Sequence, residues 1–181
     1  MNLLDALLMS RKLKFEDGSI TLYGEGAAIL PLDGFIMYVG EISNDTEVAR
    51  LLYSTMRNSM LERRQKLITE AEGAKQAEWL CASVNVYGYG RIRYSKPTTA
   101  INGTLILEES PFTKILKGKA TTPVDHIIRG AIAGIASAIT GRDMHAVEAY
   151  CAVSDHDNCQ LVLDSKEMLA KEFVELFNQQ I

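Results

Sequence analysis

Apolar residues recur along this chain with the period of strands in some segments and with the period of helices in others. Near the N-terminus, short apolar pairs flank the polar turn Glu16-Asp17-Gly18, which predicts a β-hairpin, and a further strand is expected to end at residue 30. Residues 32–42 are apolar enough for a short buried helix. We therefore expect residues 1–43 to form an N-terminal unit whose hairpin dimerises with a second copy of the chain.

A stripe of helical period follows Asn44 and Asp45, either of which can cap a helix. The apolar stripe consists of Val48, Leu51, Leu52, Thr55, Met56 and Met60. A second helix is expected after Gly73 and should end at the glycine-rich stretch 87–90. Its inward-facing residues are predicted to be Ala77, Leu80, Cys81 and Val84.

The C-terminal part of the chain predicts a sheet. Residues 91–95 and 101–108 have the pattern of two strands, and residues 144–153 and 159–163 that of a final hairpin. Between them, Thr122 and Asp125 have the spacing of a capping box, which predicts a helix from Pro123 to Ile139. An amphipathic helix closes the chain. The predicted fold is α+β, with helices covering a four-stranded, mainly antiparallel sheet in a domain of residues 44–181.

Composition adds limits on partners. The chain is 47% hydrophobic and 23% charged, which is typical of a globular protein with a core. A net charge of −4 and a pI near 5.4 argue against nucleic acid as the main partner. The one basic cluster, Arg57, Arg63, Arg64 and Lys66, is predicted to be a solvated helix face. No apolar run approaches the ~20 residues that span a bilayer, and the start is a poor signal peptide. We expect a cytoplasmic protein without a membrane partner.

The candidate chemistry lies in the final hairpin, where Glu148 and Cys151 are followed by Cys159. If the loop is centred near Asp155, the two thiols face one another across the ladder, and with a carboxylate oxygen they suit tetrahedral zinc. A reducing compartment favours a metal over a disulfide. Residues three apart on a regular strand point to opposite faces, so Glu148 and Cys151 can share a metal only if a bulge or a strand end intervenes.

Other interpretations of these residues stay open. A reduced, buried thiol pair without metal is the simpler alternative. His145 and His156 lie nearby, but on an exposed strand and loop each is expected to be solvated. Cys81 is predicted to be buried packing.

The stretch from Pro123 through Leu163 resembles the 4-vinyl reductase domain family of small-molecule-binding modules. The matching motifs are Pro123-Val124-Asp125, the Gly130-x-x-x-Gly134 helix, Glu148-Ala149-Tyr150-Cys151 and Cys159, with Tyr87 to Ile92 similar to the family's entry into the sheet. The resemblance implies a fold shared with haem-NO-binding and TRAPP trafficking proteins, and a relation to sensor domains of aromatic-responsive transcription activators.

In those activators a cysteine, a glutamate and two further cysteines hold one structural zinc. The matching positions here are Asp125, Glu148, Cys151 and Cys159. The chain departs from the family at the first ligand, where aspartate replaces cysteine and His126 stands beside it. Aspartate can bind zinc through oxygen, so the resemblance implies a zinc site with a harder ligand set. Whether Asp125 or His126 completes it is left open.

Small residues dominate the predicted helix before the final hairpin. They allow close packing on a neighbouring element, which is the simpler interpretation, or they leave room for a ligand. The small residues are Gly130, Ala131, Ala133, Gly134, Ala136, Ser137 and Ala138. Residues available to line a pocket are Trp79, Tyr53, Met56, Tyr87 and Phe112, and the sequence does not choose among them.

The sequence shows no phosphate loop, dinucleotide fingerprint or catalytic triad, and we expect no catalysis. The leading hypothesis is a cytoplasmic sensor domain that binds an apolar or aromatic small molecule, is stabilised by zinc and forms a homodimer. One alternative is a protein-interaction scaffold that resembles the trafficking proteins. A weaker alternative is an enzyme of tetrapyrrole reduction, as the family's name implies.

Overall fold

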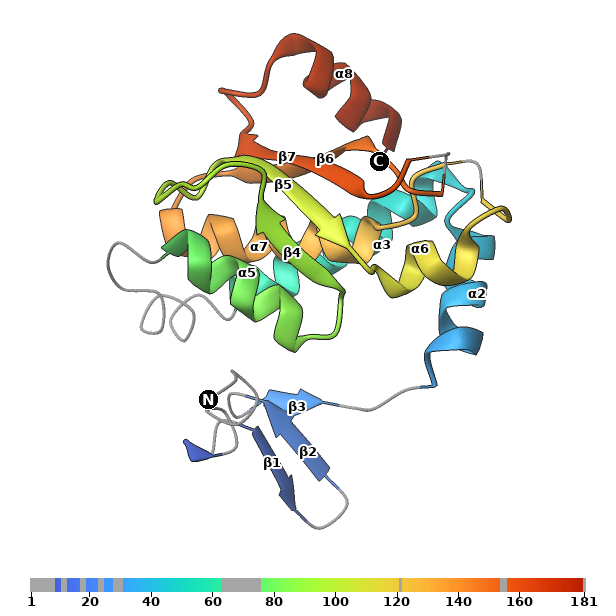
Figure 1. Ribbon diagram of the computed structural model, residues 1–181, viewed down its shortest axis with the longest axis vertical. Helices are drawn as coiled ribbons and strands as arrows, with labels where there is room; N and C mark the ends of the chain where they lie inside the picture. The colour runs from blue at the N-terminus through green and yellow to red at the C-terminus, as the bar shows by residue number, and fades with distance from the viewer. Residues whose placement is uncertain are drawn as a thin grey trace.

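The structure is a computed structural model that describes residues 9–10, 13–16, 19–22, 25–27, 31–62, 76–120, 122–153 and 156–180. Its N-terminal part is a three-stranded antiparallel sheet of β1 (Leu13–Glu16), β2 (Ser19–Leu22) and β3 (Glu25–Ala27). The predicted hairpin is confirmed. Figure 1 shows this sheet apart from the larger sheet, and the main hydrophobic core includes none of its described residues.

Helix α2 (Leu32–Ile42) follows and packs by one face only. Its buried residues are Ile36, Val39 and Gly40, and Gly40 lies against Leu116 of α6 (Pro111–Leu116). The expectation of a buried helix is therefore correct for one side. The exposed apolar residues are Leu32, Phe35, Met37 and Tyr38.

Helix α3 (Thr46–Glu62) begins where the sequence predicts, with the Asp45 carboxylate accepting from the backbone N–H of Glu47 at 2.8 Å. Its buried stripe differs from the predicted one. Ala49, Tyr53 and Met60 are buried, whereas Leu51 is 62% exposed. The inward face is selected by the neighbouring helix α7 (His126–Thr140), because its Gly130 and Gly134 leave room for this side of α3 to approach closely.

The larger sheet has the strand order β4-β5-β7-β6 and is antiparallel throughout. Its strands are β4 (Arg91–Tyr94), β5 (Gly103–Glu108), β6 (Met144–Tyr150) and β7 (Cys159–Ser165). Burial alternates along β7, so that Cys159, Leu161 and Leu163 face inward while Gln160 and Val162 are half-buried. The α+β class with a four-stranded sheet is confirmed.

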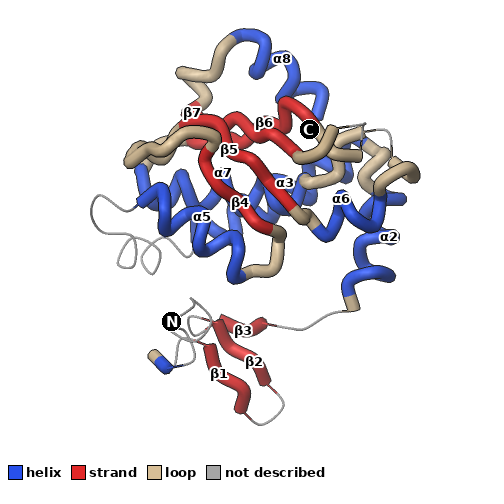
Figure 2. The backbone as a smooth tube through the Cα atoms, in the orientation of Figure 1, coloured by secondary structure: helices blue, strands red, loops and turns tan. Residues whose placement is uncertain are grey.

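Helices α3, α5 (Gln76–Val86) and α7 (His126–Thr140) lie together along the sheet, and α8 (Lys171–Gln180) contacts the edge strand β6 (Figures 1 and 2). Every residue from His126 to Ala138 is buried. The predicted start at Pro123 is wrong, because α7 begins at His126 and Asp125 is its N-cap. The Asp125 side chain makes no capping hydrogen bond, since other groups hold its carboxylate.

Close packing of α3 on α7 explains two glycines of the small-residue helix. A methyl group at Gly130 would collide with the backbone oxygen of Tyr53, and one at Gly134 with that of Arg57. The close-packing interpretation is therefore confirmed for both glycines. Arg57 is not a solvated residue as predicted, because it forms an ion pair with Asp143 and its side chain is only 15% exposed. Arg63, Arg64 and Lys66 lie outside the described residues.

Among the described residues, no helix combines the length and the apolar character needed to cross a bilayer.

Substitution Gly130→Ala tests the contact between α3 and α7. We expect the free energy of unfolding to fall by about 1–3 kcal/mol, because the added methyl group meets backbone rather than a side chain that can move. Gly34→Ala in α2 is the control, since nothing lies within 4 Å of its Cβ position. It should be neutral or stabilise by about 0.5–1 kcal/mol. Urea denaturation measures both, and equal stability of the two variants would contradict the close contact.

Candidate metal site

Four buried side chains from separate parts of the chain converge between α7 and the final hairpin. Asp125 precedes α7, Glu148 lies in β6, Cys151 directly follows β6 and Cys159 begins β7. Their exposed fractions range from 0% for Asp125 to 5% for Cys151. One ligand atom from each residue lies within 4.8 Å of those from the other three. The structure therefore brings together the four residues that the resemblance implies.

A β-bulge places Glu148 and Cys151 on one face of the sheet. Glu148 pairs with Leu161 and Tyr150 pairs with Gln160, so Ala149 is an extra residue on β6. Without it, Glu148 and Cys151 would point to opposite faces. With it, Cys151 follows the inward orientation of Glu148 and reaches the side of Cys159. This is the irregularity that a shared metal requires.

The hydroxyl groups of α6 support the Asp125 carboxylate. Ser110 donates to Asp125 Oδ1 at 2.7 Å, and the Thr113 hydroxyl lies 3.5 Å from Oδ2. Ser110 also caps α6, where its Oγ accepts from the Thr113 backbone N–H. Both hydroxyls are buried and come from a segment that precedes Asp125 by more than ten residues. They orient the carboxylate toward the two thiols.

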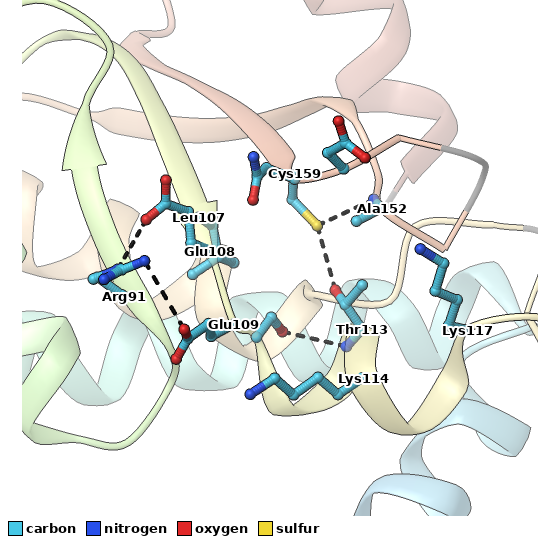
Figure 3. A pocket seen from close by; sticks show the side chains of 12 residues that line it. Arg91, Leu107, Glu108, Glu109, Thr113, Lys114, Lys117, Ala152 and Cys159 are labelled. Atoms are coloured by element: carbon cyan, nitrogen blue, oxygen red, sulfur yellow. Dashed lines mark hydrogen bonds and ion pairs between the residues drawn. The ribbon is translucent and has the colours of Figure 1, made fainter.

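The thiol of Cys159 is also held from outside the cluster. Its Sγ lies 3.3 Å from the Thr113 hydroxyl and 3.3 Å from the backbone nitrogen of Ala152 (Figure 3). The pKa of Cys151 falls to about 7 because the Cys159 thiol hydrogen-bonds to it, and that bond together with burial raises the pKa of Cys159. The ionisation of the two thiols is therefore linked, because a charge on one disfavours a charge on the other.

Both oxygens of the Glu148 carboxylate are buried, and within the described part of the chain neither has a hydrogen-bond partner of acceptable geometry. Burial raises the pKa of Glu148 well above its usual value, and the nearby Asp125 and Cys151 raise it further. A buried carboxylate is normally hydrogen-bonded, paired or bound to a metal. A divalent cation would satisfy Glu148 and neutralise part of the cluster, so the residues present fit a metal with two sulfur and two oxygen ligands.

A cavity of about 390 Å³ lies on the outer side of this cluster. Its lining includes Cys159, Ser110 and Thr113, together with Lys114 of α6 and Lys117, which directly follows α6 (Figure 3). On the opposite side Arg91 forms an ion pair with Glu108 at 2.8 Å. Most of the residues that line the cavity are charged or polar, so it differs from a wholly apolar ligand pocket.

None of the three histidines belongs to the cluster of four. His126 Nδ1 instead accepts from Arg129 at 2.6 Å. Burial, together with the nearby charge of Arg129, lowers the pKa of His126 to about 3, so this side chain is neutral. His145 is not solvated as expected, because its side chain is 12% exposed and contacts the hydroxyl of Tyr53 at 3.1 Å. His156 is exposed, in agreement with the prediction.

The predicted lining residues are dispersed through the core. Tyr53 and Phe112 are buried, whereas Trp79, Met56 and Tyr87 are half-buried and pack against the same core. Sequence reasoning missed the groups around the metal site, namely Ser110, Thr113, Arg129 and Gln180. The sequence did contain a signal for Arg129. After His126 it is the one charged residue in an otherwise uncharged stretch that extends to Thr140, and a lone charge in a buried helix needs a partner.

No protein-family model matches the sequence, and no curated protein matches it either. Solved structures do match. The phenol-responsive sensory domain of the transcription activator PoxR, solved with phenol, matches with a TM-score of 0.80 at 20% identity over 99% of this chain and 98% of its own. A vinyl-4-reductase family protein from Methanocaldococcus jannaschii matches with a TM-score of 0.52 at 15% identity, over 77% of this chain and 83% of that chain.

A third match is trafficking protein particle complex subunit 3 from Naegleria fowleri, which is covalently bound to palmitic acid. It has a TM-score of 0.51 at 12% identity and covers 77% of this chain and 98% of its own. These three likenesses confirm the fold that the resemblance of the sequence implies.

Substitution Cys151→Ala tests whether the cluster binds a metal. We expect the wild-type chain to bind about one divalent ion and the variant to lose it, because only one thiolate remains. The control is Cys81→Ala, since Cys81 lies on α5 outside the cluster and burial raises its pKa to about 11. Elemental analysis of untagged protein measures both. A metal content that is equally low in all three proteins would contradict the site.

Proposed function

We propose that this chain is a small-molecule sensor domain that binds an aromatic or other apolar compound and contains a structural zinc ion. The observation that carries the proposal is the similarity to the phenol-responsive sensory domain, which extends over 99% of the chain. The likeness to the trafficking subunit covers 77% of it. The sensor is therefore preferred over an interaction scaffold. The proposed activity is binding, without catalysis and without tetrapyrrole reduction.

The ligand set supports zinc as the metal. Asp125, Glu148, Cys151 and Cys159 supply two carboxylate oxygens and two thiolates, which suits four-coordinate zinc. Four protein ligands leave no open position for a reacting water, so the proposed role is structural. Zinc would tie the start of α7 to the final hairpin. Structural zinc contributes about 10–16 kcal/mol of apparent binding energy in small peptides, so even a fraction of this matters to the domain.

A cytoplasmic location agrees with the state of the cysteines. All three cysteines are free, and a reducing compartment keeps buried thiols available for a metal. A net charge of −4 gives the chain little overall electrostatic attraction for nucleic acid. We infer that a partner protein, or another part of a longer polypeptide, carries any signalling output.

We also propose that the chain forms a homodimer through its N-terminal part. The sheet β1–β3 stands apart from the main core, and α2, the next described element along the chain, exposes apolar side chains. Phe35 is 39% exposed, Met37 42% and Tyr38 61%. A symmetric partner would cover the same surface on both copies, which makes the contact self-complementary. The proposed interface extends the one expected from the hairpin alone.

Binding of an aromatic ligand can be measured with the chain's single tryptophan. Trp79 is half-buried against the core, so we expect phenol or a related monocyclic aromatic to change its fluorescence. At one hundred times its dissociation constant, such a ligand should stabilise the fold by about 2.7 kcal/mol. Cyclohexanol controls for general apolar binding, and Trp79→Phe, which removes the only tryptophan, for the emission of the ligand itself. A screen of aromatics that shifts neither the melting temperature nor the fluorescence would favour the scaffold.

Substitution Tyr38→Glu tests the proposed dimer. It places a charge on the exposed face of α2, and a symmetric interface would contain it twice. We expect dissociation of the dimer to become at least about tenfold easier. Met168→Glu is the control, because Met168 is 70% exposed but lies before α8. Sedimentation equilibrium measures both variants. Unchanged association of Tyr38→Glu would place the interface elsewhere, and a monomeric wild type would refute the dimer.

A further inference from the structure

Arg129 is a fully buried cation next to the metal site. It lies in α7, one turn after Asp125, and its exposed fraction is 0%. Its guanidinium donates to the side-chain oxygen of Gln180, to Gln180 O at 3.4 Å and to Nδ1 of the neutral His126 at 2.6 Å. None of the ion pairs among the described residues involves it. A buried charge without an adjacent counter-charge is costly, so its negative partner must be sought nearby.

Gln180 connects this cation to the metal ligand Glu148. Its Oε1 accepts from the Arg129 guanidinium and also from the backbone nitrogen of Glu148 at 3.1 Å. Its Nε2 donates to the backbone oxygen of Glu148 at 2.6 Å. Because β6 is the edge strand, the amide of Gln180 takes the place of a neighbouring strand at this residue. A single oxygen atom therefore separates the guanidinium from the backbone of a ligand.

The charge of the ligand set identifies the missing counter-charge. All four ligands are anionic when they bind a metal, and a divalent ion neutralises only two of the four negative charges. The remainder lies in a space nearly closed to water. Burial lowers the pKa of Arg129, and the largest opposing effect comes from Glu148. Asp125 and Cys151 act in the same direction. Arginine stays protonated in proteins, so it supplies a permanent positive charge.

We propose that Arg129 is the buried counter-ion of the metal centre and that Gln180 holds it beside Glu148, so that both residues set metal affinity without being ligands. This inference rests on the zinc site of the proposed function. Groups that surround a metal's ligands typically change metal affinity about 10–100-fold when they are substituted.

Arg129→Met and Arg129→Lys test the role of the charge. Zinc affinity of the full chain is measured by competition with a chromophoric chelator, and the stability of the metal-free protein by urea denaturation. We expect Arg129→Met to weaken zinc binding about 10–100-fold, whereas Arg129→Lys keeps most of the affinity. Apolar replacement of a buried charge is often tolerated, so metal-free Arg129→Met should still fold. Arg57→Gln is the control, since Arg57 bonds to Asp143 and Met144 instead.

The outcomes separate an electrostatic role from a packing role. A packing role would lower the stability of the metal-free protein and leave the zinc dissociation constant unchanged, which would overturn the proposal. If Arg129→Met does not fold, Gln180→Met provides the test, because it removes the hydrogen bonds to both Arg129 and Glu148. We expect it to weaken zinc binding about tenfold or more. Wild-type affinity in Gln180→Met would then overturn the proposal.

The same experiment distinguishes failure of the counter-ion from failure of the metal site. A wild-type chain that binds no zinc would refute the metal centre itself and the inference with it. Tight binding by the wild type, with the same affinity in the Arg129 and Gln180 variants, would refute only the role assigned to these two residues.

Discussion

Four side chains that must lose their protons to bind a metal lie within 4.8 Å of one another in a space almost closed to water. Like charges at such separations repel strongly, and burial removes the solvent that would screen them. The group is therefore compatible with a folded protein only if protons remain on it or a cation neutralises it. The groups around the cluster meet this constraint by donating hydrogen bonds to it. The hydroxyl of Ser110 donates to Asp125, and the backbone N–H of Ala152 donates to Cys159.

The same constraint explains how distant segments are held together. The cluster joins the N-terminal end of α7 to both strands of the final hairpin, and Ser110 attaches α6 to it. The bulge at Ala149 would weaken a regular ladder, but it is needed for Glu148 and Cys151 to face the same ion. Gln180 then fixes α8 to the edge of β6 at that point. Elements that already share the hydrophobic core are thus also coupled through one polar centre.

Periodicity predicted the strands of the sheet and the main helices, because alternation and helical spacing are local properties of the sequence. It failed where a neighbour selects the face, as at Leu51, which is apolar but lies on the solvent side of α3 because Gly130 and Gly134 admit the opposite side. The ligand set followed from a motif, whereas its surroundings did not. Arg129 and Gln180 are 51 residues apart, and no spacing rule connects them.

Asp125 shows how the site accommodates its departure from the cysteine that the family resemblance implies. A thiolate is soft and has one sulfur atom to share, whereas a carboxylate has two oxygens and can accept hydrogen bonds while it binds a metal. Ser110 and Thr113 are placed to use the acceptor sites that the metal leaves free on the carboxylate. Ser110 donates to one oxygen at 2.7 Å, and the Thr113 hydroxyl lies 3.5 Å from the other. Thr113 also touches Cys159, so one hydroxyl serves an oxygen ligand and a sulfur ligand together. The aspartate is therefore integrated with α6, and a cysteine at this position would leave the Ser110 hydroxyl without a comparable acceptor.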